Sequence, residues 1–440
     1  MTFTELGING DFTETLGSRN IQEPSEIQRL VIPALLAGTE LSEESGAPHF
    51  LFSSPTGTGK TLAYALPLLQ RLNRPAESSA GGGDFPREFR RGPELLVLAP
   101  TYELCSQIKK ELDAMFSRGR VSGEASPPAS SQDSRRVFRS ALLIGQAPLD
   151  RQIDSLKKHP DAVVGNPARV LQLVRMKKLS LKALRYLVLD EGDRLMADEL
   201  FPETAELCRA AFPAGTGPAD RAELAPPGCR LIACSATFSA KNREKLFSLV
   251  PFVSGKAGWN IITQERNDIL RKNIEHWAFF AEEREKTDLL RSFIAAVKPS
   301  KILVFTSRAG QVGRIVSRLQ YRHLAAAGLW GDMDKKARKA AIDGFRKGNI
   351  TILVSSDLAA RGLDVEGISH IVALDIPEGE ETYIHRAGRT ARAGRRGVMA
   401  SFGDEEELRR LARIEKKLGI AVFPKELYGG RVNAPVLEAP

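Results

Sequence analysis

Cysteine is scarce in this sequence, with four residues in 440, and no two of them are spaced as Cys-x-x-Cys. This pattern excludes a disulfide scaffold and a zinc ribbon, and it is typical of free thiols in a reducing cytoplasm. No apolar run approaches the roughly 20 residues of a membrane-spanning helix. The opening residues, MTFTELGINGDF, lack the basic and apolar regions of a signal peptide. We therefore expect a cytoplasmic protein with no membrane partner.

The composition that remains is that of a globular protein, with 42% hydrophobic and 27% charged residues. A chain of 440 residues can bury two cores of ordinary size. The formal net charge is +9, and residues 261–440 carry +7 of it, with 31 Lys and Arg against 24 Asp and Glu. A basic balance favours a polyanion partner, although a solvated basic face explains the charge alone equally well.

The stretch SSPTGTGKT at 53–61 follows the apolar run Phe50–Phe52 and precedes a helical pattern. Gly57 and Gly59 allow a sharp turn whose N–H groups approach phosphate oxygens, and the following helix adds its positive end. Lys60 and Thr61 are then placed for the β/γ-phosphates and Mg²⁺. The strict motif has glycine where this chain has Ser54, so the alternative is a glycine-rich turn before an ordinary helix. The sequence favours a phosphate-binding loop.

Short apolar runs alternate with helical patterns along both halves of the chain. Continuous apolar runs indicate strands buried on both faces, as in a parallel sheet covered by helices. The expected strands are 95–100, 141–144, 162–165, 186–191, 231–237, 302–306, 351–357, 370–377 and 397–402. In the second half we expect helices at 309–327, 334–347, 380–393 and 404–418.

The pattern breaks near residues 251–275, which divides the chain into two α/β domains. The boundaries we expect are 1–255 for the first domain, 256–275 for a linker, 276–425 for the second domain and 426–440 for a short tail. Three stretches rich in Gly, Pro and Ser, at 75–93, 118–136 and 213–228, are expected to be exposed insertions.

Two further features of the sequence are candidates for metal or phosphate binding. Asp190 and Glu191 end a buried strand, and ligands of open α/β sheets sit beyond the carboxyl ends of strands. A carboxylate there can hold Mg²⁺ and its neighbour can orient water, although a helix-capping carboxylate is the alternative. Arginines recur every three residues at 386, 389, 392 and 395, which on a helix places them near one face. They are either a solvated basic face or a set of groups that bind phosphates.

In this order the motifs resemble those of the DEAD-box RNA helicases of superfamily 2, over residues 1–425. Phe3 lies upstream of a Q motif that reads Pro24-Ser25-Glu26-Ile27-Gln28. The other matching segments are SPTGTGKT (54–61), Asp190-Glu191-Gly192-Asp193 in place of D-E-A-D, Ser235-Ala236-Thr237, SDLAARGLD (356–364) and HRAGRTAR (385–392).

The resemblance implies two tandem RecA-like domains that use ATP and Mg²⁺ and bind RNA. Nucleotide contacts are implied for Phe3, Pro24, Gln28, Thr56, Gly57, Thr58, Gly59, Lys60, Thr61 and Asp364. Catalytic roles are implied for Lys60, Thr61, Asp190, Glu191, Arg389 and Arg392, with Thr61 and Asp190 at the metal. Coupling of ATP to RNA is implied for Asp193, Ser235, Thr237, His385 and Arg386. Contacts to the RNA sugar-phosphate backbone are implied for Pro100, Thr101, Asn166, Arg169, Gly331, Asp332, Arg338 and Ser356.

Several residues depart from the family pattern. Near the ATP site, Ser54 and Gly192 each replace Ala, and Ala391 replaces a Gly, which we expect to favour the helix there. In the RNA-facing motifs the departures are Tyr102, Gln146, Asn166, Ala168 and Lys335. ATP hydrolysis therefore looks intact, whereas the contacts to RNA differ from those of the family.

The function that we expect is RNA-stimulated ATP hydrolysis coupled to local unwinding or remodelling of RNA duplexes or RNA–protein complexes. One alternative is an ATP-dependent RNA clamp or assembly factor that does not unwind, which the altered RNA-facing motifs support. The other is a DNA helicase, against which Phe3, Gln28 and the HRAGRTAR segment argue.

Overall fold

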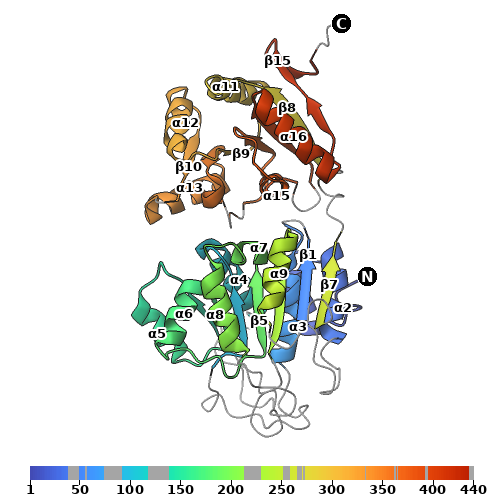
Figure 1. The fold of residues 1–440 in the computed structure, drawn as a ribbon, viewed down its shortest axis with the longest axis vertical. Coiled ribbons are helices and arrows are strands. Elements are labelled where there is room, and N and C mark those ends of the chain that lie inside the picture. The colour runs from blue at the N-terminus through green and yellow to red at the C-terminus, as the bar shows by residue number, and fades with distance from the viewer. Residues whose placement is uncertain are drawn as a thin grey trace. The chain divides into compact units, whose positions relative to one another are not determined.

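The computed structural model divides into two units, one formed by Met1–Ser54 with Gly59–Gln264 and one by Pro55–Thr58 with Glu265–Pro440 (Figure 1). The residues it describes are 1–37, 49–54, 57–73, 92–116, 138–212, 229–250, 258–264, 270, 273–331, 333–360, 363, 365–391 and 395–435. The three expected insertions lie almost entirely outside these residues, apart from 92–93. Among the described residues, no helix is both long and apolar enough to cross a membrane.

The first unit is built on a seven-stranded sheet in the order β3-β4-β2-β5-β6-β1-β7, and all its strand pairs are parallel. Its strands are β1 (His49–Ser53), β2 (Leu95–Leu98), β3 (Ser140–Leu143), β4 (Ala162–Gly165), β5 (Tyr186–Asp190), β6 (Arg230–Ser235) and β7 (Trp259–Thr263). Its helices are α1 (Gly10–Ser18), α2 (Glu26–Ala37), α3 (Lys60–Leu72), α4 (Tyr102–Ala114), α5 (Leu149–Leu156), α6 (Pro167–Arg175), α7 (Gly192–Leu195), α8 (Phe201–Ala211) and α9 (Ala240–Ser248).

Helices cover both faces of this sheet, because successive strand residues point to opposite sides and both sides are apolar. On β2, Leu95 and Val97 belong to the core under α3 and α4, whereas Leu96 and Leu98 belong to the core under α6, α8 and α9. All four side chains are fully buried. The expected sandwich of a parallel sheet between helices is confirmed.

The second unit repeats this plan with the order β10-β11-β9-β12-β13-β8-β14, again all parallel. Its strands are β8 (Ile274–Phe280), β9 (Ile302–Phe305), β10 (Ala326–Leu329), β11 (Ile352–Ser355), β12 (His370–Ala373), β13 (Gly397–Gly403) and β14 (Val422–Pro424). Its helices are α11 (Lys286–Val297), α12 (Ala309–Tyr321), α13 (Lys335–Lys347), α14 (Asp357–Ala360), α15 (Glu380–Ala387) and α16 (Glu405–Leu418).

Some boundaries differ from the expectations. Residues 256–275 were expected as a linker, but Trp259–Thr263 pairs with β1 as edge strand β7, and β8 already begins at Ile274. Part of the expected tail forms a hairpin of β15 (Glu426–Tyr428) and β16 (Arg431–Asn433). Its Leu427 and Val432 pack on a hydrophobic core of the second unit. In β7, Trp259 packs on one core of the first unit and Ile262 on the other, whereas Ile261 is 37% exposed, as fits a strand at the edge of the sheet.

The helix expected at 309–327 is also too long. It ends at Tyr321, and Ala326–Leu329 forms β10, which pairs with β11. The sequence AAGL has low strand propensity, so burial beside β11 decides its conformation. A side chain at Gly328 would lie 2.8 Å from Val312 Cγ1, so the glycine also permits close packing of α12 on this strand.

Candidate functional site

The phosphate-binding loop connects β1 to α3. Gly57 and Gly59 have φ angles of 79° and 84°, a region that favours glycine. A Cβ atom at Gly59 would lie 2.3 Å from Gln28 Nε2, so no side chain fits there without displacing Gln28. Thr58 lies in the same turn, and Thr56 lies outside the described residues. The local sequence therefore forms the strand, turn and helix that we expected.

Lys60 is the first residue of α3, and its Nζ donates a hydrogen bond to the Ser54 carbonyl at 2.8 Å. Burial lowers the pKa of Lys60, while the negative charges of Asp190, Glu191 and, more weakly, Asp193 act in the opposite direction. These carboxylates therefore lie close enough to the ammonium to influence its protonation. Tyr64, four residues after Lys60 on α3, is hydrogen-bonded to Asp190, so the start of α3 lies beside the end of β5.

Asp190 is held by three donors at the end of β5. Its Oδ2 accepts from the Tyr64 hydroxyl at 2.9 Å, and its Oδ1 accepts from the Glu191 N–H at 2.9 Å and the Cys234 thiol at 3.3 Å. Burial, followed by the Asp190 charge, raises the pKa of Tyr64 well above its ordinary value. Sequence reasoning missed Tyr64. The available signal was its position four residues after Lys60, on the same face of α3.

Glu191 follows with φ 51° and ψ 50°, a left-handed conformation that costs a non-glycine residue energy. Residues held in such conformations cluster at active sites, so the backbone of Glu191 supports a functional role for it. Gly192 begins the short helix α7, and a Cβ there would lie 2.7 Å from Phe238 Cζ. The glycine in D-E-G-D is therefore matched to the Phe238 ring packed against it.

The donor set fits Mg²⁺. This ion uses one or two carboxylates together with phosphate oxygens and water, rather than a cage made only of protein groups. Asp190 supplies a carboxylate and Thr61 a hydroxyl beside the phosphate-binding loop. Within the described ranges, no cluster of three or more His, Cys, Asp or Glu side chains is arranged to hold a metal alone.

The base-binding candidates lie at the start of α2. Gln28 Oε1 accepts from the Ser25 N–H at 2.9 Å, and its Nε2 donates to the Gly59 carbonyl at 3.0 Å. One acceptor position and one N–H of the amide remain for a base edge. Pro24 is buried beside it. Phe3 is only 3% exposed and packs in the hydrophobic core, so it would have to leave that core to stack on adenine.

The expected coupling residues of the first unit are in contact. The Thr237 hydroxyl donates to Asp193 Oδ2 at 3.4 Å, and the Thr237 N–H donates to the Ser235 hydroxyl at 3.3 Å. The Ser235 carbonyl accepts the Ser54 N–H at 3.1 Å. Movement at the phosphate-binding loop can therefore reach β6 and α7 through direct bonds.

RNA-facing candidates follow the carboxyl ends of β2 and β4. Thr101, next to the half-buried Pro100, caps α4 by accepting from the Leu104 N–H at 3.3 Å, and Tyr102 is 40% exposed. Asn166 is the N-cap residue of α6, and Arg169 donates to the carbonyls of Gly145 at 3.0 Å and Ala147 at 3.1 Å. Arg169 thus orders the turn that contains Gln146.

In the second unit the candidates follow β10 and β11. Gly331 is exposed after β10, and the Ser356 N–H donates to the Leu329 carbonyl at 3.3 Å. Arg338 Nη2 donates to the Ala359 carbonyl at 2.9 Å, so α13 is tied to α14. Asp332 and Asp364 lie outside the described residues.

The arginine series does not lie on one helix, which corrects our expectation. Helix α15 ends at Ala387 with Gly388 as its cap, so of the four arginines it contains Arg386 alone, next to His385. Arg386 is 2% exposed, and its Nε and Nη2 donate to the two Asp357 carboxylate oxygens, each at 2.6 Å. Arg389 is buried and donates to the Leu363 carbonyl at 3.1 Å. Arg392 lies outside the described residues, and Arg395 is exposed beyond the helix.

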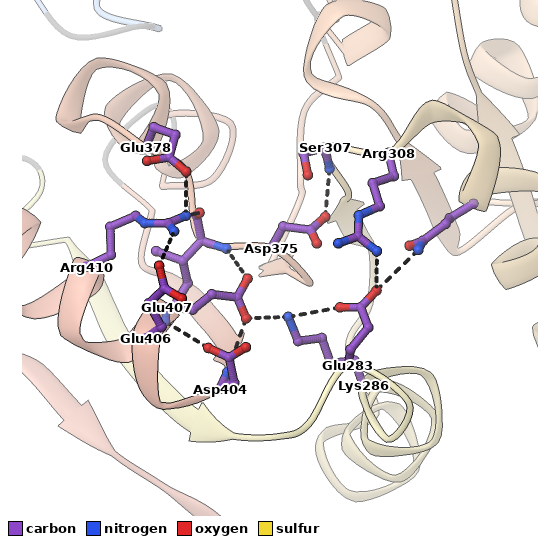
Figure 2. A network of polar contacts seen from close by, with 12 residues as sticks. Glu283, Lys286, Ser307, Arg308, Asp375, Glu378, Asp404, Glu406, Glu407 and Arg410 are labelled. Carbon is purple, nitrogen blue, oxygen red and sulfur yellow. Dashed lines mark hydrogen bonds and ion pairs between the residues drawn. The ribbon is translucent and has the colours of Figure 1, made fainter.

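A polar network that the sequence did not predict joins the ends of four strands in the second unit (Figure 2). Lys286, 4% exposed, donates to Glu407 Oε2 at 2.5 Å and lies 3.5 Å from Glu283. Glu283 also pairs with Arg308 at 3.0 Å, and Glu407 accepts from the Ile376 N–H at 3.3 Å. The network fixes the loops after β8, β9, β12 and β13 relative to one another.

Comparison with known proteins gives the family. A DEAD/DEAH box helicase model matches residues 25–246, and a helicase conserved C-terminal domain model matches residues 285–394. The DEAD-box ATP-dependent RNA helicase CshC of Bacillus cereus is 32% identical over 411 residues, which cover 93% of this chain and 89% of CshC. The probable ATP-dependent RNA helicase YfmL of Bacillus subtilis is 29% identical over 420 residues, covering 96% and 95%.

Among solved structures, S. cerevisiae Dbp5 bound to RNA and ADP BeF3 matches with a TM-score of 0.74 and 24% identity. The match covers 96% of this chain and 95% of that chain, which confirms the fold of two tandem RecA-like domains. Together with the two family models and the relatives, these findings show that the chain belongs to the DEAD/DEAH box helicase family.

Proposed function

We propose that this protein is an ATP-dependent RNA helicase that couples RNA-stimulated ATP hydrolysis to local remodelling of RNA duplexes or RNA–protein complexes. The observation that carries the proposal is the 2.9 Å hydrogen bond to Asp190 from Tyr64 of α3, the helix that follows the phosphate-binding loop, in a chain 32% identical to a protein named as a DEAD-box ATP-dependent RNA helicase. Asp193, three residues after Asp190, is bonded to Thr237 and so connects this site to β6.

In the proposed mechanism, Gly57–Lys60 and the start of α3 bind the phosphates of ATP. Thr61 and Asp190 would hold Mg²⁺, which when bound neutralises charge on the β- and γ-phosphates. Glu191, which follows Asp190 in a left-handed backbone conformation, orients the attacking water and accepts its proton. The D-E-G-D variant keeps every charged group of this site, since only a methyl group is lost at Gly192.

Roles in recognising the base and in neutralising charge in the transition state are also proposed. Gln28 has hydrogen-bonding capacity left for the adenine edge, which supports ATP over other nucleotides. Arg389 and Arg392 are proposed to stabilise charge on the γ-phosphate, and Asp364 to contact the ribose. Arg386 has a different role: its two bonds to Asp357 hold α15 and α14 together, so it positions the neighbouring His385 and Arg389.

RNA is proposed to bind through its sugar-phosphate backbone along the strand ends of both units. Residues proposed for this surface are Pro100, Thr101, Asn166, Arg169, Gly331, Asp332, Arg338 and Ser356. The net charge of +9 supports binding to a polyanion. The four free cysteines support a cytoplasmic location, where protein or ribonucleoprotein partners would be met.

A non-unwinding RNA clamp is the second candidate, and Tyr102 favours it. This side chain is 40% exposed beside the Thr101 cap, where the family has an arginine, so one phosphate contact is replaced by an aromatic ring. A clamp would bind RNA with ATP and hydrolyse slowly without separating strands.

One experiment separates these functions. We would measure unwinding of short RNA and DNA duplexes with the full chain while following ATP hydrolysis in the same samples. RNA unwinding with RNA-stimulated hydrolysis supports the helicase, and hydrolysis or RNA retention without strand separation supports the clamp. Unwinding of the DNA duplex in preference to RNA, with equal use of other nucleoside triphosphates, would contradict both.

A further inference from the structure

A hydrogen-bond chain crosses the start of the phosphate-binding loop and has no role in the mechanism above. Ser54 is fully buried, and its hydroxyl lies 2.5 Å from Gln264 Oε1. Gln264, 7% exposed, follows directly after β7, and its Nε2 lies 2.6 Å from Glu26 Oε2. Glu26 is the first residue of α2. Residues far apart in the sequence therefore meet beside the proposed ATP site.

The chemistry of the three groups fixes the direction of this chain. The Gln264 amide donates from Nε2 to Glu26 Oε2, because an amide oxygen cannot donate a hydrogen bond to a carboxyl oxygen. Its Oε1 then faces Ser54 as an acceptor, and the Ser54 hydroxyl is the donor. The hydroxyl thus has a defined partner in this protein, and an alanine at position 54 would remove that donor from a buried acceptor.

The chain closes a ring around the loop. The Ser54 carbonyl accepts from Lys60 Nζ at 2.8 Å, which connects the first residue of the loop to the last. On α2, two residues after Glu26, Gln28 donates to the Gly59 carbonyl at 3.0 Å. Both ends of the loop are therefore tied to the same helix, one end through Gln264 and the other through Gln28.

We propose that Gln264, together with Ser54 and Glu26, is a positioning element of the nucleotide site. It holds the loop entrance and the start of α2 in one arrangement, so that Lys60 meets the phosphates while Gln28 meets the base. A site already held in its bound geometry loses less conformational freedom when the nucleotide binds. This inference rests on the proposed function, because it takes ATP as the ligand.

The test compares MgATP affinity, measured by titration calorimetry on the full chain, with the melting temperature measured without nucleotide. Ser54→Ala and Gln264→Leu are each expected to weaken MgATP binding by about 3–10-fold, which corresponds to one lost hydrogen bond. The double variant is expected to bind MgATP with the same affinity as the single variant that shows the larger loss, since each substitution breaks the same hydrogen-bond chain. Ser248→Ala is the control and should match the wild type, because the Ser248 hydroxyl donates to the Lys245 carbonyl within α9.

Exchanging the amide and the carboxylate between positions 264 and 26 tests whether MgATP affinity can be restored. Gln264→Glu alone places two carboxylates together and should weaken MgATP binding, with affinity recovering as pH falls and one carboxyl group protonates. Adding Glu26→Gln restores a donor toward the new carboxylate, which can also accept from Ser54, so affinity should return to near the wild-type value. This pair remains informative even where a single variant folds poorly.

Two results would overturn the inference: variants that lower the melting temperature but bind MgATP as the wild type does, or an exchange variant that regains stability without regaining affinity. A wild-type protein that does not bind MgATP would instead contradict the proposed function, so the two failures are distinguishable.

Discussion

At the scale of single residues, Gly192 shows how a substitution is fitted to its surroundings. Replacing it with alanine would recreate the family's D-E-A-D, but the new methyl group would lie 2.7 Å from the Phe238 ring, which is buried. We expect Gly192→Ala to lower the free energy of unfolding by about 1–3 kcal/mol through overpacking. Urea unfolding followed by circular dichroism measures the effect.

The matched control is Gly313→Ala on α12, where a Cβ meets nothing within 4 Å and alanine should stabilise the helix by about 0.5–1 kcal/mol. Gly192→Ala combined with Phe238→Leu should recover most of the loss. If Gly192→Ala alone is as stable as the wild type, the contact with Phe238 does not explain the glycine.

Ala391 gives the opposite case and corrects our expectation that it favours a helix. It lies beyond the end of α15 with φ 53°, a conformation that glycine adopts without strain. Ala391→Gly should therefore leave stability unchanged or raise it by up to about 1 kcal/mol, although the added freedom of the unfolded chain offsets part of the gain. A loss of more than 1 kcal/mol in urea unfolding would show that the alanine methyl group is needed for packing.

His49 predicts a pH dependence. Burial, and then the charge of Arg230, lowers the pKa of His49 to about 4, while its Nδ1 accepts from the Leu231 N–H at 3.0 Å. In the unfolded chain His49 is protonated below about pH 6.5, whereas in the folded protein it stays neutral down to about pH 4. The contribution of neutral His49 to stability is therefore complete above pH 6.5 and is lost progressively toward pH 4. The loss amounts to about 3 kcal/mol. Urea unfolding between pH 7.5 and 4.5 should show a shallower pH dependence in His49→Gln, and equal dependence in both proteins would contradict this role.

At the scale of elements, the sequence predicted those parts that depend on local patterns. The strand, glycine turn and helix at residues 50–72 could be predicted, because periodicity and glycine positions are local properties. Strand β10 could not, because AAGL becomes a strand only through its pairing with β11. The bond from Tyr64 to Asp190 and the ring through Gln264 were also missed, since each joins residues that only the fold brings together.

The network of Figure 2 gives a prediction for the ends of β8 and β13. Lys286 is buried and its ammonium lies 2.5 Å from Glu407, so Lys286→Met would leave a poorly solvated carboxylate without its partner. We expect a loss of about 3–5 kcal/mol in the free energy of unfolding. Lys286→Met combined with Glu407→Gln should recover part of this loss, because no unpaired charge remains.

The control is Lys417→Met, which removes another Lys–Glu pair, with Glu380 at 3.2 Å and the Lys417 side chain 64% exposed. Its effect should stay within about 1 kcal/mol, because water solvates both groups. Similar losses in the two variants would mean that burial does not distinguish these pairs.

At the scale of the whole molecule, the proposed mechanism uses residues of both units. The first holds Lys60, Asp190 and Glu191, and the second holds Arg389 and Arg392, which are proposed to neutralise charge on the γ-phosphate. RNA that contacts residues of both units would favour the hydrolysis-competent arrangement by binding it more tightly than others. We therefore expect residues 1–264, which retain β7 and Gln264, to bind ATP without RNA-stimulated hydrolysis.

The measurement is single-turnover ATP hydrolysis by residues 1–264 and by the full chain, each with and without RNA. An arginine that acts on the transferred phosphate contributes a factor of about 10³–10⁵, so the full chain with RNA should exceed the fragment by orders of magnitude. Glu191→Gln in the full chain is the control for chemistry: it should bind ATP and RNA but not hydrolyse ATP, because water is no longer activated. If the fragment hydrolyses ATP as fast as the full chain does with RNA, the catalytic groups all lie in the first unit and the two-unit mechanism is wrong.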